Sequence, residues 1–128
     1  FNNINLSIIY LTNIFNSPGS ISEIWKHAII NNEKLIVTDE KCTRFFLTKE
    51  QAVSLLVEQN IDYNSIKAVN LGNLLKALIS KYNENYDLNL ITKVGLKNTE
   101  HLHEYYNISD QWSNSSVQYE KTELINII

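Results

Sequence analysis

The sequence has 128 residues, of which 44% are hydrophobic and 20% charged, and its formal net charge is -3 with a pI near 5.6. This composition is typical of one globular domain and excludes a disordered chain. The acidic balance, without a basic cluster, argues against a nucleic-acid-binding surface, so we expect no nucleic-acid partner.

Cysteine content and hydropathy bear on location. The single cysteine, Cys42, excludes an internal disulfide framework and fits a reducing compartment. No apolar run approaches the roughly 18 residues that a membrane-spanning helix needs, and no signal peptide is recognisable. We therefore expect a cytoplasmic location and no membrane partner for this segment.

The first half of the chain predicts a strand, a helix and two short strands. Residues 5–15 are rich in β-branched and aromatic side chains, which predicts a strand buried on both faces. Residues 16–20 are turn formers, after which Ser20 or Ser22 can cap a helix that runs to about Asn31. Short strands are predicted over residues 35–38 and 44–47.

The second half continues the alternation of helices and strands. Thr48 is a good N-cap for a helix over residues 49–59, and further elements are a strand at 65–69, a helix at 71–82 and a strand at 89–97. Residues 101–106 predict a helical turn, and residues 124–128 predict an edge strand. This alternation predicts an α/β fold in a single domain.

Arg44 is the only arginine among eleven basic residues. A guanidinium can bind a phosphate or carboxylate through two parallel hydrogen bonds, which a lysine cannot do. The position of Arg44, between an apolar run and a helix start, favours a residue retained for that geometry. An ordinary surface or ion-pair arginine is the alternative.

Two features typical of dehydrogenases, a glycine-rich loop and a Tyr–Lys pair, do not indicate a cofactor or catalytic site in this sequence. The glycines Gly19, Gly72 and Gly95 are scattered, so no glycine-rich nucleotide loop exists. Tyr63 and Lys67 have the spacing of a short-chain-dehydrogenase catalytic pair, but that pair needs a helix and these residues lie in a predicted turn and strand. We interpret the match as chance and assign no catalytic or cofactor-binding residue.

A metal or thiol site is also disfavoured. His101 and His103, with carboxylates beside them, have a spacing that can ligate zinc, but no further ligand cluster accompanies them. Cys42 has no evident base partner and is not predicted to be a nucleophile. We expect no metal, and the alternative of a zinc domain at the two histidines predicts zinc-dependent melting.

Three segments together resemble one family, the extended short-chain dehydrogenase/reductases that act on nucleotide sugars. The family patterns are R-Y-G-N-V-x-G-S-R-G-S-V, then K-P-L-T-V-T-D-x-x-M-T-R-F-F-M-T-x-x-x-A-V, then G-I-R-P-G-E-K-L-H-E. Residues 10–21, 33–53 and 95–104 follow these patterns in the same order and spacing. The resemblance is strongest to the UDP-N-acetylglucosamine 4,6-dehydratases of polysaccharide and glycan biosynthesis.

The resemblance implies a fold and a role. The chain is expected to be the carboxy-terminal, substrate-binding lobe of such an enzyme, with the last strand or strands of its Rossmann sheet and without the Rossmann half. Residues 1–128 would form one nucleotide-sugar-binding lobe, in which residues 1–15 are a sheet strand of the absent cofactor domain. Such a lobe cannot carry out the hydride chemistry alone.

The resemblance also implies the site. Arg44 would bind the diphosphate, Lys97 would lie by the phosphates, Glu100 would accept from a ribose hydroxyl and Asn13 would contact the nucleotide sugar. The segment that contains Leu35, Val37 and Thr38 would lie along the uracil. These seven residues are the predicted substrate site.

The implied partners are a UDP-sugar and the chain's own amino-terminal Rossmann half, which would bind the NADP or NAD of the family; a homo-oligomer is left open. The chain departs from the family patterns at several positions: Tyr10, Pro18 and Lys97 stand where the patterns have Arg, and Thr12 stands where they have Gly. Loss of cations around a diphosphate weakens its binding. The second hypothesis is therefore a non-catalytic, degenerate remnant or interaction module that keeps the fold without the ligand.

Overall fold

The computed structural model describes residues 8–58 and 62–128. Within them the helices are α1 (Ile21–Ile30), α2 (Lys49–Val57), α3 (Leu71–Tyr82) and α4 (Lys121–Ile127), with 3-10 turns at Tyr63–Ser65 and Leu88–Leu90. The strands are β1 (Asn13–Ile14), β2 (Leu35–Val37), β3 (Thr43–Leu47), β4 (Ala68–Asn70), β5 (Ile91–Lys93), β6 (Tyr105–Tyr106) and β7 (Gln111–Trp112). None of these helices is both long and apolar enough to cross a membrane.

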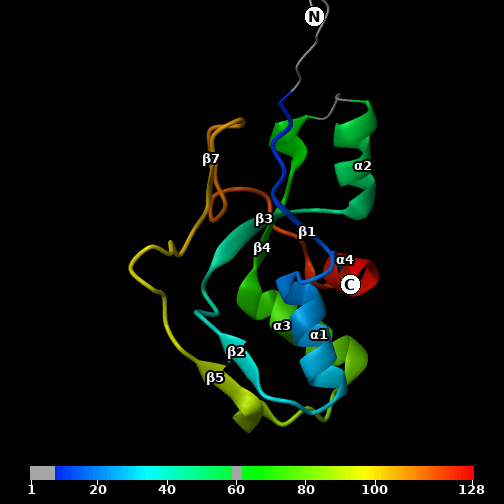
Figure 1. Ribbon diagram of the computed structural model, residues 1–128, viewed down its shortest axis with the longest axis vertical. Helices are drawn as coiled ribbons and strands as arrows, with labels where there is room; N and C mark the ends of the chain where they lie inside the picture. The colour runs from blue at the N-terminus through cyan, green and yellow to red at the C-terminus, as the bar shows by residue number, and fades with distance from the viewer. Residues whose placement is uncertain (1–7, 59–61) are drawn as a thin grey trace, which may run out of the picture.

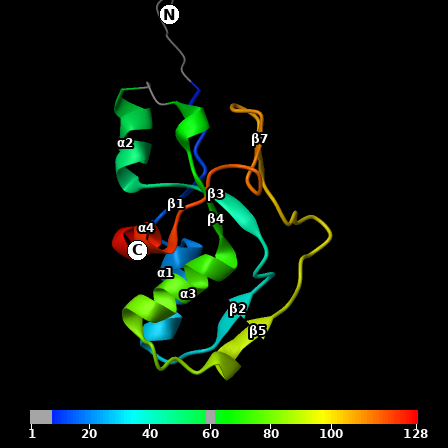
Figure 2. The ribbon, with the colours of Figure 1, turned by 180° about the vertical axis from the view of Figure 1, so that it is seen from behind.

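Strand β3 is the centre of the fold. It pairs in parallel with β1 and antiparallel with β4, while β2 and β5 form a separate parallel pair and β6 and β7 form a hairpin. Helices α1, α3 and α4 lie together between the β2–β5 pair, at one end of the molecule, and α2 at the other end (Figures 1 and 2). The predicted α/β fold class is confirmed.

Local sequence accounts for three of the helices. The Ser20 side chain accepts a hydrogen bond from the Glu23 N–H at the start of α1, and the Asn70 side chain does the same for Asn73 at the start of α3. Thr48 and Gln51 form a reciprocal capping box at the start of α2. Each cap satisfies backbone donors that the first helical turn leaves without partners.

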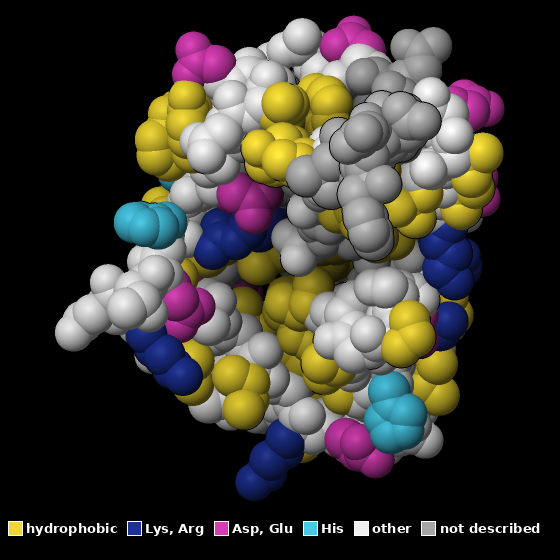
Figure 3. Space-filling view, turned by 45° about the horizontal axis from the view of Figure 1, so that its top comes forward, with side chains coloured by type: hydrophobic (Ala, Val, Ile, Leu, Met, Phe, Trp, Pro, Cys, Tyr) yellow, Lys and Arg dark blue, Asp and Glu magenta, His cyan; other side chains and the backbone are white. Residues whose placement is uncertain are grey.

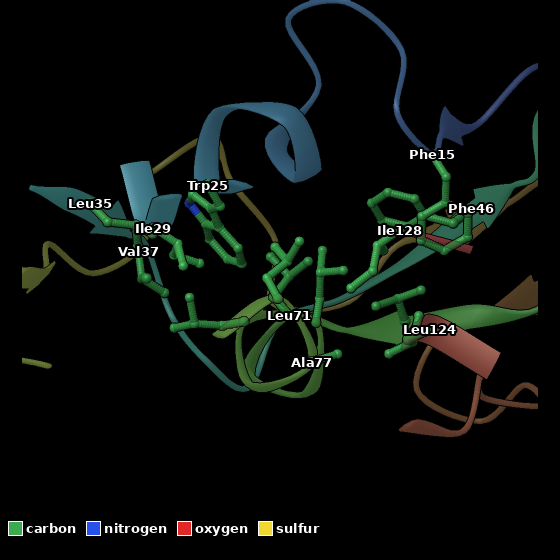
Figure 4. Packing of buried hydrophobic residues seen from close by; sticks show 14 of the residues in the cluster. Phe15, Trp25, Ile29, Leu35, Val37, Phe46, Leu71, Ala77, Leu124 and Ile128 are labelled. Carbon is green, nitrogen blue, oxygen red and sulfur yellow. The ribbon is translucent and has the colours of Figure 1, made fainter. Parts of the chain in front are cut away.

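The core has two parts, one on each face of β3. Phe46 packs with Phe15, the apolar faces of α1 and α3, and α4, and Figure 4 shows these side chains pointing toward one another between the elements. Phe45 and Leu47 point to the opposite face and pack with Leu55 of α2. Because successive side chains of a strand point to opposite faces, β3 is buried on both sides and joins the two clusters.

Several predicted strands are shorter than expected. Residues 5–7 lie outside the described part, and of residues 8–15 only β1 is strand, while Ile8, Tyr10 and Leu11 are exposed. The prediction of a strand buried on both faces is therefore wrong for residues 8–12, since they pair with no other strand in the part of the chain that the structure describes. The strand predicted at 65–69 is a 3-10 turn followed by β4, and the strand predicted at 89–97 is reduced to β5.

Two predictions of element type are wrong. Residues 101–106 are extended rather than helical, because Thr43 of β3 bridges to His103 and the chain then enters β6. Residues 124–127 belong to α4 and Ile128 is its C-cap, so this segment is not an edge strand. A capping box between Glu120 and Glu123 starts this helix, and the fully buried Leu124 fixes it on the core.

Candidate functional site

Two segments that are distant in the sequence enclose a pocket of about 410 Å³ beside β3. The chain after β5 runs along the edge of the molecule and returns to β3 before it forms the β6–β7 hairpin (Figures 1 and 2). Figure 3 shows a hollow near the middle of that view, with hydrophobic side chains inside it and a basic and an acidic group beside it on the left. The pocket is lined by Arg44, Thr99, Glu100, His101, His103, Glu104, Tyr105 and Trp112.

Arg44 connects β3 to the segment between β5 and β6 (residues 94–104), which we call the returning segment. Its Nη1 donates to the carbonyl oxygens of Thr43 at 2.7 Å and Leu102 at 2.9 Å, and its Nη2 donates to the carbonyl oxygen of His101 at 2.5 Å. Three of the five guanidinium donors are therefore used on backbone carbonyls. Arg44 has a structural role in this fold.

The remaining donors of Arg44 are the Nε–H and one N–H of Nη2. They have no acceptor among residues 8–58 and 62–128. In a planar guanidinium these two groups can point along the same edge, which is one of the two forks that bind a carboxylate or phosphate in a bidentate way. The structural role of Arg44 thus leaves one fork for an anion in the pocket.

Glu100 lies in the same pocket as Arg44. Its Oε1 accepts from the backbone N–H of Lys97 at 3.2 Å, and its own N–H donates to the Lys97 carbonyl at 2.9 Å, so the two residues close a tight turn. The Lys97 residue is exposed on this turn. The structure therefore brings together the guanidinium and the carboxylate that the sequence assigned to one site.

A buried hydroxyl cluster fixes the pocket wall. Thr43 Oγ1 lies 2.6 Å from His103 Nδ1 and 2.7 Å from Ser113 Oγ, and Ser113 Oγ accepts from the Glu104 N–H at 2.8 Å. Thr43 and Ser113 are buried. These bonds hold β3, the returning segment and the residue that follows β7 in one arrangement.

Glu104 is the second carboxyl group of the pocket. Its Oε1 accepts from the Phe45 N–H at 3.1 Å. Burial raises the pKa of the Glu104 carboxyl, while the hydrogen bond from Phe45 and the charge of Arg44 act in the opposite direction. The pocket therefore holds one partly buried acid whose charged form is disfavoured.

Asn13 lies in a different pocket. It is exposed in β1 and lines a pocket of about 360 Å³ together with residues of the 17–21 turn. Its side-chain amide donates to the Phe45 carbonyl at 3.4 Å. Among the described residues, those lining the pocket of Arg44 do not include Asn13.

The segment with Leu35, Val37 and Thr38 also lies apart from the lining of the Arg44 pocket. The Leu35 and Val37 side chains are buried in the core. The carbonyls of Val37 and Thr38 accept from the N–H groups of Val94 and Gly95. Any contact between a ligand and Leu35 or Val37 would therefore involve backbone atoms.

Comparison with known proteins identifies the family. A model of the family described as polysaccharide biosynthesis protein matches residues 2–126. The chain belongs to this family. The resemblance seen in the sequence is confirmed at this level, and no curated protein matches the chain.

A solved structure supports the fold of this family member. The X-ray structure of Pen from Bacillus thuringiensis is similar to it with a TM-score of 0.71 at 22% sequence identity. The match covers 92% of this chain and 47% of that chain. The family member thus spans about half the length of that protein, with the same fold over the shared part.

The residues of this family member do not fit a dinucleotide. A dinucleotide site needs closely spaced glycines at a turn between a strand and a helix. Where β4 leads directly into α3, the only glycine is Gly72 in the first turn of the helix; an added Cβ there would meet the Glu40 carbonyl oxygen at 2.9 Å, so this glycine allows close packing of two chain segments. Nor, in the described residues, do three or more His, Cys, Asp or Glu side chains converge as a metal site.

Sequence reasoning missed the residues that complete the pocket. Glu104, Tyr105 and Trp112 line it, and none of them was predicted as a site residue. The available signal was the pair of large aromatic residues Tyr105 and Trp112 on either side of residues 106–111, which include the turn formers Asn107, Ser109 and Asp110, a pattern typical of a hairpin. Because we predicted a helical turn over residues 101–106, we did not predict the hairpin that begins at Tyr105.

Proposed function

We propose that this chain binds a nucleotide sugar, as the substrate-binding part of a 4,6-dehydratase of the UDP-N-acetylglucosamine type in polysaccharide biosynthesis. The observation that carries the proposal is that Arg44 and Glu100 line one pocket although they are far apart in the sequence. A guanidinium suits a diphosphate, and a carboxylate suits the hydroxyls of a ribose. The volume of about 410 Å³ lies within the range of small-molecule sites, roughly 300 to 1,000 Å³.

The proposal also includes the other residues that were predicted to contact the ligand. Lys97 stands on the turn that presents Glu100, where a flexible ammonium can approach a phosphate. Asn13, Leu35, Val37 and Thr38 would contact parts of the ligand that extend beyond the Arg44 pocket. NADP or NAD, a Rossmann-type half and a homo-oligomer belong to the proposal for the whole protein, and we assign no catalytic residue to this chain.

Calorimetry of UDP-N-acetylglucosamine with the wild type and with Arg44→Ala tests the proposal, preferably with a Rossmann-type half present. We expect binding by the wild type and at least tenfold weaker binding by Arg44→Ala, because charge-assisted hydrogen bonds to the diphosphate are lost. Lys26→Ala is the matched control: it also removes one positive charge, and Lys26 does not line this pocket. Equal affinity of all three proteins would remove Arg44 from the proposed role.

One observation favours the second candidate, a remnant that keeps the fold without the ligand. Three donors of Arg44 bind backbone carbonyls, so the residue can be retained for stability alone. This candidate predicts that Arg44→Ala lowers the melting temperature while the wild type gives no binding heat with UDP-N-acetylglucosamine. Measurable binding by the wild type would reject it.

A further inference from the structure

The His103 ring is held through one of its two nitrogens by a pair of buried hydroxyl groups. Its Nδ1 lies 2.6 Å from Thr43 Oγ1, which lies 2.7 Å from Ser113 Oγ. The Ser113 hydroxyl also lies 3.0 Å from the Thr43 carbonyl oxygen, to which it donates. The Glu104 N–H donates to the Ser113 hydroxyl oxygen at 2.8 Å. Each of these contacts needs a proton, and only a few protons are available to make them.

A count of these protons shows which nitrogen of the imidazole is protonated. Ser113 has one hydroxyl proton, and the Thr43 carbonyl can only accept it. The contact between the two hydroxyl oxygens then uses the Thr43 proton, so Thr43 has none left for the imidazole. The bond between His103 and Thr43 is therefore made by a proton on Nδ1. With Nδ1 as acceptor, one of the two contacts between Ser113 and Thr43 would lack a proton.

The other ring nitrogen of His103, Nε2, remains available to a ligand. Within residues 8–58 and 62–128 no group forms a hydrogen bond with Nε2, and the ring lines the same pocket as Arg44 and Glu100. When Nδ1 carries the proton of the neutral ring, Nε2 carries a lone pair, and a second proton there makes the ring cationic. His103 thus presents a proton acceptor to a pocket in which Arg44 offers donors only.

Several charged or titratable groups surround the His103 ring. Those that line the pocket with it are Arg44 of β3, Glu100, His101 and Glu104 of the returning segment, and Tyr105 of β6. The positive charge of Arg44 opposes a second positive charge on His103, whereas the carboxylates favour it. An anion bound by the free fork of Arg44 offsets that positive charge. Anion binding therefore favours the protonated form of the imidazole.

We propose that His103 is the proton acceptor of this pocket and that a diphosphate ligand binds together with a proton at Nε2. The inference rests on the proposed function, because it takes the ligand to be a nucleotide sugar. One proton passes from solvent to the Nε2 lone pair, no bond between heavy atoms changes, and the new N–H can donate to a phosphate oxygen. Since histidine is the side chain that ordinarily changes charge between about pH 5 and 8, binding strengthens as the pH falls through that range.

Nitrogen-15 NMR of the imidazole rings tests the proton assignment without any ligand. Long-range proton–nitrogen spectra distinguish protonated from unprotonated ring nitrogens in each of the three histidines, and His103→Asn identifies the signals of His103. We expect the neutral ring of His103 at pH 8 to carry its proton on Nδ1. Thr43→Val removes the hydroxyl acceptor and should populate the other tautomer. A wild-type ring protonated on Nε2 alone would overturn the inference, whether or not the variants fold.

Calorimetry of UDP-N-acetylglucosamine in buffers of different ionisation enthalpy measures the protons taken up on binding. The diphosphate of this ligand is esterified at both ends and has no proton that titrates near pH 7. We expect proton uptake by the wild type at pH 7, and an association constant that rises by up to about tenfold per pH unit from pH 8 to pH 6. His103→Asn keeps an amide donor for Thr43 but has no Nε2, so it should bind without proton uptake and without this pH dependence.

Two further variants identify the group that takes up the proton. His27→Asn removes an exposed histidine that lies beside Glu33 and does not line the pocket, so the uptake should be unchanged. Glu104→Gln removes the partly buried acid of the pocket, and the uptake should persist in this variant as well. Uptake that is lost in Glu104→Gln but kept in His103→Asn would assign the proton to Glu104 and overturn the inference.

The outcomes separate this inference from the proposed function. If UDP-N-acetylglucosamine binds the wild type without proton uptake, the role of His103 is rejected and the nucleotide-sugar site stands. If it does not bind the wild type at any pH from 6 to 8, the nucleotide-sugar site is rejected and the coupled proton uptake is rejected with it.

Discussion

Burial and the neighbouring positive charge of Arg44 act in opposite directions on the pKa of the Glu104 carboxyl. Burial raises the pKa of its carboxyl above the ordinary value of 4.5, and Arg44 and the Phe45 N–H counter this only in part. The native state thus binds the Glu104 proton more tightly than the unfolded state does. The stability that this proton contributes is fully present below pH 4.5 and is lost as the pH rises through the raised pKa.

Glu104→Gln is therefore expected to be more stable than the wild type at pH 7. Glutamine keeps a side-chain oxygen for the Phe45 N–H but carries no charge that burial would penalise. The advantage should shrink as the pH falls through the raised pKa toward 4.5, because the wild-type carboxyl becomes protonated as well. Urea unfolding at pH 7 and at pH 4 measures the free energy of unfolding of both proteins.

The exposed Glu84 provides the control for this comparison. Glu84→Gln should change the free energy of unfolding by less than about 0.5 kcal/mol at pH 7, as is usual for surface substitutions. A Glu104→Gln protein less stable than the wild type at pH 7, or a difference that does not vary with pH, would contradict the assignment.

At the level of elements, α2 depends on its first turn. The Thr48 side chain accepts from the Gln51 N–H at 3.1 Å, and the Gln51 side chain accepts from the Thr48 N–H at 2.9 Å. In the described part of this helix, the residues buried against the core are Ala52 and Leu55. With so few buried contacts, the cap contributes a large share of the stability of the helix.

Thr48→Ala should lower the free energy of unfolding by about 1 kcal/mol, because the N–H groups of the first turn lose their acceptor. Lys49→Ala, at the next and exposed position, is the matched control and should be nearly neutral because alanine is a good helix former. Urea unfolding of the two variants gives the comparison. Equal stability of the two variants would show that the capping box does not hold α2.

The whole molecule depends on α4 as well as on β3. Leu124 is fully buried in the cluster that contains Phe46, and the Tyr82 hydroxyl and Lys81 ammonium of α3 donate to the Ile128 carbonyl at 2.6 and 3.0 Å. The Asn16 side chain, in the turn after β1, donates to the Ile127 carbonyl at 2.8 Å. Helix α4 therefore closes the core between segments from the start and the middle of the chain.

Leu124→Ala should lower the free energy of unfolding by about 2 to 5 kcal/mol, since it leaves a cavity in the core. The loss should appear as one cooperative shift of the far-UV and tryptophan signals, because the buried Trp25 belongs to the same cluster. The exposed Thr122 of the same helix gives the control Thr122→Ala, which should change stability by less than about 0.5 kcal/mol. Separate transitions for the two signals would show that α4 is not part of this core.

The sequence by itself determined the family, the α/β class and the helices α1, α2 and α3, because caps such as Ser20, Thr48 and Asn70 and the spacing of apolar residues act over a few residues. The extent of the strands and the type of the 101–106 and 124–128 segments were decided only in the tertiary structure. A strand forms where a partner lies beside it, as at the bridge between Thr43 and His103, and a short apolar end becomes a helix where Leu124 meets a core. The pocket also depends on the tertiary structure. The family pattern indicated Arg44 and Glu100, but Trp112 lines the same pocket only because the chain returns to β3 in the folded protein.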